Sequence, residues 1–443
     1  MYPNPQDVLP LPPRPDLDHY RKRAKELVRA CSSADPAAID AWAARWVRDL
    51  IELRPESDRA QYAREVGRYG QQVAGFARER LVPAACALAQ AQYVIARAHG
   101  FASWPRLVHH LEALGARSPV STFEAAADAI VTGDRATLER LLRRDPDLVH
   151  ARSSREHRAT LLHYVAANGV ENYRQQTPPN IVEIARLLLD EGAEVDAGAD
   201  VYGGGATALG LVLTSAHPRA AGVQLDLADL LLERGARIGP GSVRSCLTNG
   251  CPEAAGYLAR RGAPLGLEEA AGIGRLDLVA HHFDGRSLAD PAWRQEVGDA
   301  LMMAVWYGHT DVVEFFLGRG FDPAWTVGGH GERRTALHLA SYEGRVAAVA
   351  LLLRHAAPVD VTDESYGTTP LVWALHAWLV EGRKDQAAYR AVVRLLAEAG
   401  AAVRAEWIDD DRVRADPELF DALMRRAAAG PETEDPADHP PPR

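Results

Sequence analysis

Residues 335–360 read TALHLASYEGRVAAVALLLRHAAPVD, and in this stretch a helical pattern is interrupted and then begins again. Apolar residues recur at helical spacing up to Gly344, which lets the chain reverse because it has no Cβ to strain. The pattern resumes through Leu351, Leu352 and Leu353. Two short helices cannot bury their shared apolar face alone, so each such pair needs a neighbour. The stretch therefore predicts one helix–turn–helix unit of a stacked array.

Related stretches recur along the chain, as they do in repeat proteins. The clearest are TLLHYVAANG, TALHLASYEG and TTPLVWALHA, and HTDVVEFFLGRGFDP repeats the second half of the pattern. Three insertions, VENYRQQTPPN, TSAHPRAAGVQ and HAWLVEGRKDQAAY, lengthen the turn between the two helices of a unit. We predict eight units, with approximate ranges 122–152, 157–197, 200–239, 240–264, 265–290, 296–325, 330–362 and 366–403.

These stretches resemble the ankyrin repeat, whose pattern is T-P-L-H-L-A-A-x-x-G followed by a second helix rich in Leu and a Gly-Ala end. The resemblance covers about residues 122–403 and implies an all-α fold, an ankyrin-repeat solenoid of about eight units. It also implies that His163 and His338 tie neighbouring backbone loops together by hydrogen bonds. The second helix of the seventh unit has Ala356 where the others end at Gly. If Ala356 is left-handed, it costs about 1 kcal/mol.

Other segments flank the predicted solenoid. Residues 1–15 are rich in proline and are expected to be extended. Residues 16–118 are predicted to be an α-helical N-terminal region, similar to the helical leader of some bacterial ankyrin proteins. Its helices are expected in DHYRKRAKELVRA, AAIDAWAARWVRDLIEL, LVPAACALAQAQYVIARAHG and SWPRLVHHLEAL. After residues 122–403, a C-terminal capping helix is expected within 404–429. The acidic, proline-rich tail at 430–443 is predicted to be disordered.

Composition argues against several classes of function. The 443-residue chain has a formal net charge of −10 and no basic run, which argues against nucleic-acid binding. Cys31, Cys86, Cys246 and Cys251 are too few and too dispersed for a disulfide framework or a zinc set, so we expect reduced thiols and no metal. The sequence shows neither a signal peptide nor an apolar run long enough to span a membrane. We therefore expect a cytoplasmic protein that binds no membrane and holds no cofactor.

The ankyrin resemblance places the two residues before the helix-breaking position on a concave groove. In the last three units these positions hold Trp306, Tyr307, Tyr342, Glu343 and His376. Aromatic side chains with polar tips are enriched at binding hot spots. The segments WTVGGHGERR and DESYG are expected to form finger-like turns beside the groove, and they add Trp325 and Tyr366 to the predicted ligand-binding residues. In the alternative, the long turn at 377–389, which carries Trp378 and Tyr389, folds back and covers these rings.

Two hypotheses of function follow. In the first, the chain is a scaffold that binds a protein partner through its concave groove and has no catalysis of its own. In the second, it is an enzyme or small-molecule binder whose aromatic groove is roofed by the inserted turns, with Tyr307, Glu343 and His376 as an acid/base set for a biosynthetic condensation, cyclisation or hydrolysis. The insertions discriminate between them, because a pocket enclosed by residues 377–389 favours the second hypothesis and an open groove favours the first.

Overall fold

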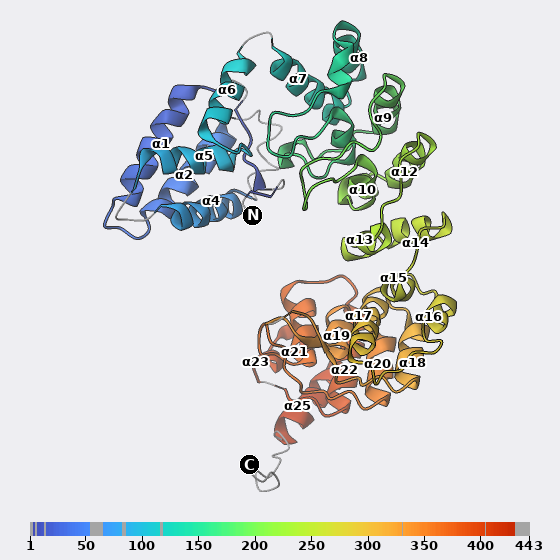
Figure 1. The fold of residues 1–443 in the computed structure, drawn as a ribbon. Coiled ribbons are helices and arrows are strands. Elements are labelled where there is room, and N and C mark those ends of the chain that lie inside the picture. The colour runs from blue at the N-terminus through green and yellow to red at the C-terminus, as the bar shows by residue number, and fades with distance from the viewer. Residues whose placement is uncertain are drawn as a thin grey trace. The chain divides into compact units, whose positions relative to one another are not determined.

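The computed structural model shows a helical chain divided into two compact units. It describes residues 3–4, 7–12, 15–53, 65–81, 86–115, 118–329, 331–403 and 405–429. The first unit comprises residues 1–242 and 249–254, and the second comprises 243–248 and 255–443. The predicted disordered tail at 430–443 lies outside the described residues. The all-α class is confirmed, because helices make up almost all of the regular structure in the described part of the chain (Figure 1).

The first unit begins with the helical region and continues into helix pairs. Its helices are α1 (Leu17–Cys31), α2 (Ala38–Glu52), α4 (Val66–Arg80), α5 (Leu88–Ala98), α6 (Trp104–Leu114), α7 (Pro119–Thr132), α8 (Arg135–Arg144), α9 (Ile181–Asp190), α10 (Ala208–Leu213), α11 (Ala216–Ala220) and α12 (Gln224–Glu233). The short 3-10 helices are η3 (Pro146–His150), η4 (Leu161–Ala166) and η5 (Asn172–Arg174). α13 (Ser242–Thr248) and α14 (Pro252–Arg260) follow where the chain passes between the units.

The second unit contains four successive helix pairs and a C-terminal group of helices. The pairs are α15 (Leu267–Gly272) with α16 (Leu276–His282), α17 (Pro291–Tyr307) with α18 (Thr310–Gly318), α19 (Ala336–Tyr342) with α20 (Val346–Arg354), and α21 (Pro370–Leu375) with α22 (Gln386–Glu398). A π-helix, η6 (His376–Val380), extends α21, and β1 (Thr326–Val327) pairs with β2 (Arg334–Thr335). The chain ends in α23 (Ala405–Ile408), α24 (Asp411–Arg414) and α25 (Pro417–Ala429).

The pair α19–α20 has the packing that its sequence predicts. Leu337 and Ala340 of α19 and Val349 and Leu352 of α20 are fully buried in one apolar cluster that continues through the neighbouring pairs. Burial of this kind contributes about 1.5–3 kcal/mol for each large aliphatic side chain. α25 adds the fully buried side chains of Leu419 and Leu423 to the same cluster. The number of repeats and the predicted domain boundaries stay predictions.

His163 and His338 have a structural role, as expected. The Nδ1 atom of His338 lies 2.8 Å from Oγ1 of Thr335 and accepts from the Thr335 backbone N–H. Its Nε2 atom lies 3.1 Å from the carbonyl oxygen of Thr368 in the next layer. His163 makes the same contacts, with Nε2 at 3.1 Å from the carbonyl oxygen of Ala206. Burial lowers the pKa of both imidazoles, so they bridge neighbouring layers as neutral rings.

The helical N-terminal region contains one element that the sequence interpretation missed. α4 spans Val66–Arg80 and packs against α2, although no helix was expected there. Its glycines conceal it in the sequence because Gly is a poor helix former. One of them, Gly70, faces the α2 backbone, where an added Cβ would lie 3.5 Å from Cα of Ala44. The expected helix at 81–100 is shorter than predicted and is found as α5, Leu88–Ala98.

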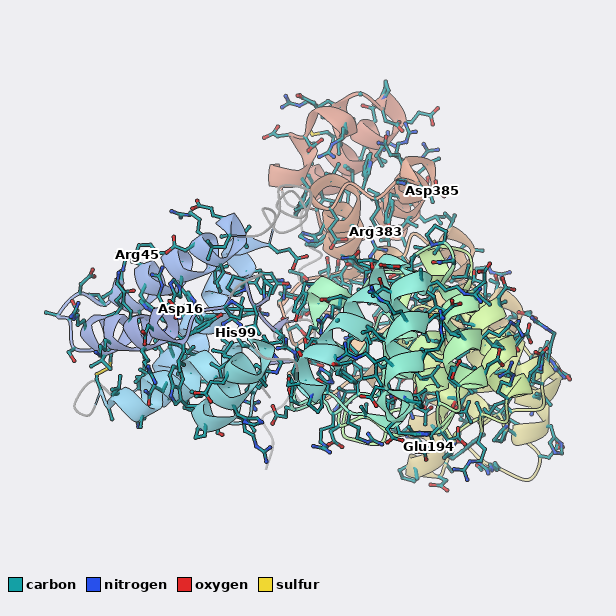
Figure 2. The ribbon with its side chains drawn as sticks, turned by 90° about the horizontal axis from the view of Figure 1, so that it is seen from above. Asp16, Arg45, His99, Glu194, Arg383 and Asp385 are labelled. Atoms are coloured by element: carbon teal, nitrogen blue, oxygen red, sulfur yellow. A yellow bond between two sulfur atoms is a disulfide. The ribbon has the colours of Figure 1, made fainter. Side chains whose placement is uncertain are left out.

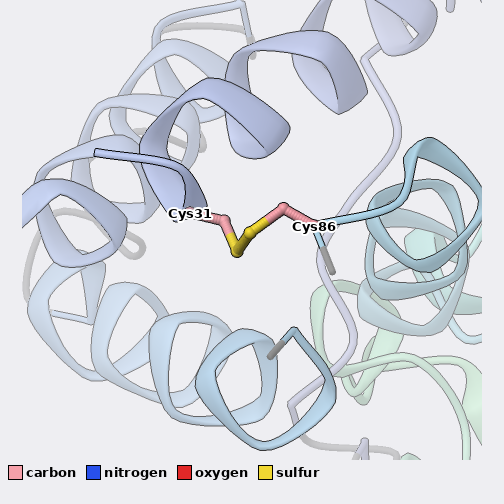
Figure 3. Close-up of a disulfide and its surroundings, with 2 residues drawn as sticks. All are labelled: Cys31 and Cys86. Carbon is pink, nitrogen blue, oxygen red and sulfur yellow. A yellow bond between two sulfur atoms is a disulfide. The ribbon is translucent and has the colours of Figure 1, made fainter. Parts of the chain in front are cut away.

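The prediction that all cysteines are reduced thiols is wrong. Cys31, the last residue of α1, forms a disulfide with Cys86, just before α5, with their Cα atoms 6.0 Å apart (Figure 3). The pair is not evident from the sequence, because the two cysteines are 55 positions apart and only the packing of the helical region brings them together. Cys246 and Cys251 are buried.

Ala356 has the left-handed conformation expected from its place after α20, with φ of 61°. Gly400 is at the equivalent place after α22, with φ of 100°. Gly carries no Cβ penalty in this region of backbone space, whereas Ala does. The α19–α20 pair therefore keeps a small, local backbone strain at Ala356.

The Ala356→Gly variant is expected to be more stable by about 0.5–1 kcal/mol, because relief of left-handed strain exceeds the entropy lost from the unfolded chain. Urea unfolding of the two proteins measures the difference. Ala399 is the matched control, since it lies one residue before Gly400 with φ of −75° and Gly there is expected to destabilise. Equal effects at both positions would contradict the assignment of strain to Ala356.

Replacing Cys31 and Cys86 by Ser is expected to lower the free energy of unfolding of the first unit by about 2–4 kcal/mol, because the crosslink restricts a long loop of the unfolded chain. Urea unfolding with and without a thiol reductant measures this loss. The reductant should destabilise the native chain and leave the doubly substituted chain unchanged. A native chain that unfolds identically under both conditions would contradict the disulfide.

Candidate groove pocket

Two finger-like turns stand beside the groove of the second unit. β1 and β2 form the first, and residues 363–368 form the second. Glu364 joins them, because its carboxylate accepts from the backbone N–H of Gly331 at 2.9 Å and its own N–H donates to the carbonyl oxygen of Arg333 at 3.0 Å. The finger-like turns expected from WTVGGHGERR and DESYG are therefore present.

A buried carboxylate orders the second finger. Asp363 is 3% exposed, and it accepts from the backbone N–H groups of Tyr366 and Thr368 at 2.7 and 3.0 Å. It also accepts from the Thr368 hydroxyl at 2.8 Å and from the indole N–H of Trp373 at 3.1 Å. Burial opposes ionisation, but these donors lower the pKa of Asp363 to about 2. One anionic side chain thus holds both the finger turn and the Trp373 ring.

The fingers and the ends of three helices line a partly open pocket of about 690 Å³. Four aromatic rings line it, together with three glutamates, an arginine and a histidine. Its lining residues are Trp306, Glu332, Arg334, Leu339, Tyr342, Glu343, Ser365, Tyr366, Thr368, Val372, Trp373, His376 and Glu381. The structure therefore brings Trp306, Tyr342, Glu343, His376 and Tyr366, five of the predicted site residues, around one cavity.

Tyr342 is the central residue of this pocket. Its ring packs edge-on against Trp373, with the centroids 5.6 Å apart, and its hydroxyl donates to Glu381 at 2.8 Å. Burial and the contact with Glu381 raise the pKa of Tyr342, so the phenol is neutral over the ordinary pH range. The ring also carries a cation on one face, because the guanidinium of Arg383 lies 4.1 Å from its centroid.

Arg383 bridges two carboxylates that line the pocket. It donates from Nη1 to Glu343 and from Nε to Glu381, each at 3.1 Å. Burial alone would lower the pKa of Arg383, but the two carboxylates raise it. Burial likewise opposes ionisation of Glu381, yet hydrogen bonds from Tyr342 and Arg383 lower its pKa. Arg383 and Glu381 are therefore both ionised at neutral pH.

The insertion after α21 folds back over part of the groove, as the alternative interpretation expected. Trp378 is 2% exposed in the core, and the Tyr389 hydroxyl donates to the carbonyl oxygen of Tyr342 at 2.7 Å. Arg383 and Asp385, labelled in Figure 2, lie in the turn that leads from η6 to α22. The cover is partial, since Tyr366 is 78% exposed.

Two predicted site residues do not line the pocket. The Tyr307 hydroxyl donates to the carbonyl oxygen of Leu247, and its ring stacks beside that of Trp306. The structure thus directs Tyr307 away from the acid/base set proposed for it with Glu343 and His376. Trp325 packs onto α17, where an added Cβ at Gly298 would lie 2.8 Å from its indole ring.

Sequence interpretation missed several lining residues. Trp373 was absent from the predicted set because it lies one turn before the groove position that His376 occupies. Trp373 lies three residues before His376, and residues three apart share one face of a helix, so this spacing could have predicted it. Arg334 and Glu332 were not predicted because they lie in a finger turn, and charged residues in a turn are usually exposed to solvent. Glu381 and Arg383 come from an insertion, so the repeat pattern gives no position for them.

The residues that the structure describes contain neither a metal-binding cluster nor a membrane-spanning helix. No three side chains of His, Cys, Asp or Glu there gather in a way that could hold a metal ion. Within the same ranges, no helix combines the length and the apolar character needed to cross a membrane.

The stacked helix pairs with hairpin fingers define a repeat solenoid. Residues 300–406 match the family model of ankyrin repeats, in three copies, which supports the ankyrin resemblance over this range. The match begins within α17 and extends past the end of α22, so it includes all the residues that line the pocket. No curated protein matches the chain.

Asp363→Asn is expected to loosen the second finger, because an amide cannot accept from all the donors that the carboxylate holds. The pKa of Asp363 is lower in the folded state, about 2, than the ordinary value of 3.8. Its stabilisation, on the order of 1–2 kcal/mol, is therefore complete above pH 4 and is lost as the pH falls towards 2. Hydrogen exchange of residues 363–373 at neutral pH should be faster in the variant. Unchanged exchange would contradict this role.

Proposed function

We propose that the chain is a non-enzymatic scaffold whose groove pocket binds a segment of a protein partner. The observation that supports this most is the pocket itself, where Trp306, Tyr342, Trp373 and Tyr366 gather around one opening. Aromatic residues with polar tips are enriched at binding hot spots, and exposed apolar clusters usually mark contact sites. Ankyrin repeats are in general associated with protein–protein interaction, which agrees with the proposal.

The form of the pocket supports a partner segment that enters from the open side. Tyr366 and His376 stand exposed at its edge, whereas Leu339 and Val372 lie deeper in its wall. A side chain that enters the pocket would remove apolar surface from water, and the polar groups at the edge would orient the segment. The rings are positioned before binding, because Asp363 holds Trp373 and Glu381 holds Tyr342. Such preorganisation reduces the entropy lost on binding.

The alternative is a small-molecule ligand. A cavity of about 690 Å³ lies in the size range of small-molecule sites, and the turn that carries Glu381 and Arg383 covers part of it. We keep this second hypothesis because a small-molecule site predicts that the inserted turn covers the pocket, and the turn does so in part. Metabolites tested for their effect on thermal unfolding would distinguish the two, since a small-molecule site predicts a raised midpoint with a defined compound.

The compartment stays a proposal as well. A cytoplasmic location was expected from the sequence, but the Cys31–Cys86 disulfide argues against a strongly reducing compartment.

Trp306→Ala is expected to weaken binding of groove-directed peptides at least tenfold, or about 1.4 kcal/mol, because it removes one wall of the pocket. The peptides are selected from a random display library on the immobilised full chain, and their affinities are measured by calorimetry. Trp306 is half-buried, so the loss of stability should stay near 1–2 kcal/mol, well below the 3–5 kcal/mol of a core tryptophan.

Two controls accompany this variant. Trp378→Ala removes a buried ring of the same unit, so it should cause the large loss of stability that Trp306→Ala avoids. Tyr202→Ala removes an aromatic side chain that is 59% exposed in the first unit, and it should leave peptide binding unchanged. If the selected peptides bind the Trp306→Ala protein as tightly as the native chain, the pocket is not the binding site.

A further inference from the structure

Arg383 occupies a place that a ligand could take. Its guanidinium lies on the face of Tyr342 and pairs with Glu343 and Glu381, and all three of these residues also line the pocket. The contacts form a complete recognition set for a guanidinium group, namely an aromatic face for stacking and carboxylates for the N–H donors. Hydrogen bonds to the backbone hold two of the pocket's aromatic residues in place. Tyr389 donates to the carbonyl oxygen of Tyr342, and Arg345 donates to that of Trp306.

Arg383 lies in a turn that the core of the unit does not hold directly. The turn from η6 to α22 is anchored at its ends, by buried Trp378 on one side and by Asp385, which caps α22, on the other. Between them the chain is exposed at Val380, with 63% of its surface accessible, and reverses at Gly382 with φ of 65°. About a third of the Arg383 side chain is accessible to solvent. Its guanidinium can therefore leave without loss of the core anchors.

The charges around the pocket favour a cation as the replacement. Its walls carry three carboxylates, from Glu332, Glu343 and Glu381, and one guanidinium, from Arg334. Together with Arg383 the balance is three negative charges against two positive ones. If Arg383 moved out and nothing replaced it, Glu343 and Glu381 would lose the cation that pairs with both, at a cost in free energy, and Glu381 would keep the hydrogen bond from Tyr342. An anionic or neutral segment could not compensate these carboxylates, whereas an arginine could.

We infer that the groove pocket binds a partner segment through an arginine side chain, and that Arg383 is the internal competitor for the same contacts. This inference rests on the proposed function and adds the chemistry of the partner to it. The partner's guanidinium stacks on Tyr342 and pairs with Glu343 and Glu381, while the rest of its segment covers Trp306 and Trp373. The ionic contacts that Arg383 loses are of the same kind as those that the partner's arginine forms, so their contributions to the binding free energy nearly cancel. The net affinity therefore comes from contact with the aromatic walls.

The direct test uses N-acetyl-arginine amide as the probe and N-acetyl-citrulline amide as its neutral isostere. Binding is followed by tryptophan fluorescence, because Trp306 and Trp373 line the pocket. Arg383→Ala should bind the arginine probe about tenfold more tightly than the native chain does, since its competitor is gone. In the Arg383→Ala background, Glu343→Gln should remove most of this gain. Circular dichroism establishes that each variant is folded, and Arg383→Lys provides a second, charge-conserving variant with an intermediate affinity.

The matched control is Glu314→Gln, which removes a carboxylate that pairs with Arg354 between α18 and α20 and does not line the pocket. It should leave the affinity for the arginine probe unchanged. Equal affinity for the arginine and citrulline probes, or no gain in folded Arg383→Ala and Arg383→Lys proteins, would overturn the inference.

The peptides selected on the full chain separate this inference from the proposed function. Both are supported if the Trp306-dependent peptides share an arginine whose replacement by citrulline costs about tenfold in affinity. If those peptides are neutral or acidic, the scaffold function stands and the arginine inference fails. If no Trp306-dependent peptide is found although the arginine probe binds, the protein-scaffold function fails and the small-molecule alternative replaces it.

Discussion

The structure depends on the contact between successive helix pairs, because no pair can bury its own apolar face. Leu337 and Ala340 are sealed only when α19 lies between α17 and α21. His338 adds direction to this stacking, since its ring joins Thr335 of one layer to the carbonyl oxygen of Thr368 in the next. The apolar contacts supply most of the free energy. The hydrogen bonds of His338 fix the position of one finger turn relative to the next.

The pocket is a consequence of that stacking. Stacking places the ends of α17, α19 and α21 side by side, so residues that the core does not need collect on one face. Asp363 and Glu381 then fix the rings of Trp373 and Tyr342 with charge-assisted hydrogen bonds. The repeat supplies the positions, while the insertion between α21 and α22 supplies the partial cover. Recognition in this account is therefore added to a scaffold whose stability has other sources.

The repeat pattern predicted the architecture well because it is periodic and local. The break at Gly344, the inward positions of α19 and α20 and the left-handed Ala356 all follow from rules about one unit. Contacts that depend on packing over long separations were not predictable in this way. The Cys31–Cys86 disulfide and helix α4 belong to that group.

The candidate site shows the same limit. Trp306, Tyr342, Glu343 and His376 were predictable because they lie at the two repeat positions before the break, whereas Trp373 needed the geometry of one helix turn. Tyr307 has the same kind of position, yet its hydroxyl reaches back to Leu247. Sequence order does not show which of two adjacent side chains turns towards the cavity. Arg383 lies in an insertion, and the repeat pattern assigns no position to inserted residues.

The aromatic side chains of the pocket serve to bind a partner and are not needed to pack the core. Hydrogen–deuterium exchange of the full chain, followed by mass spectrometry with and without a selected peptide, tests this most directly. The account predicts that the peptide slows exchange at residues 363–368 and 376–385, the finger and the covering turn, and leaves the helices of the first unit unchanged. Protection confined to the first unit, or spread evenly over the chain, would contradict it.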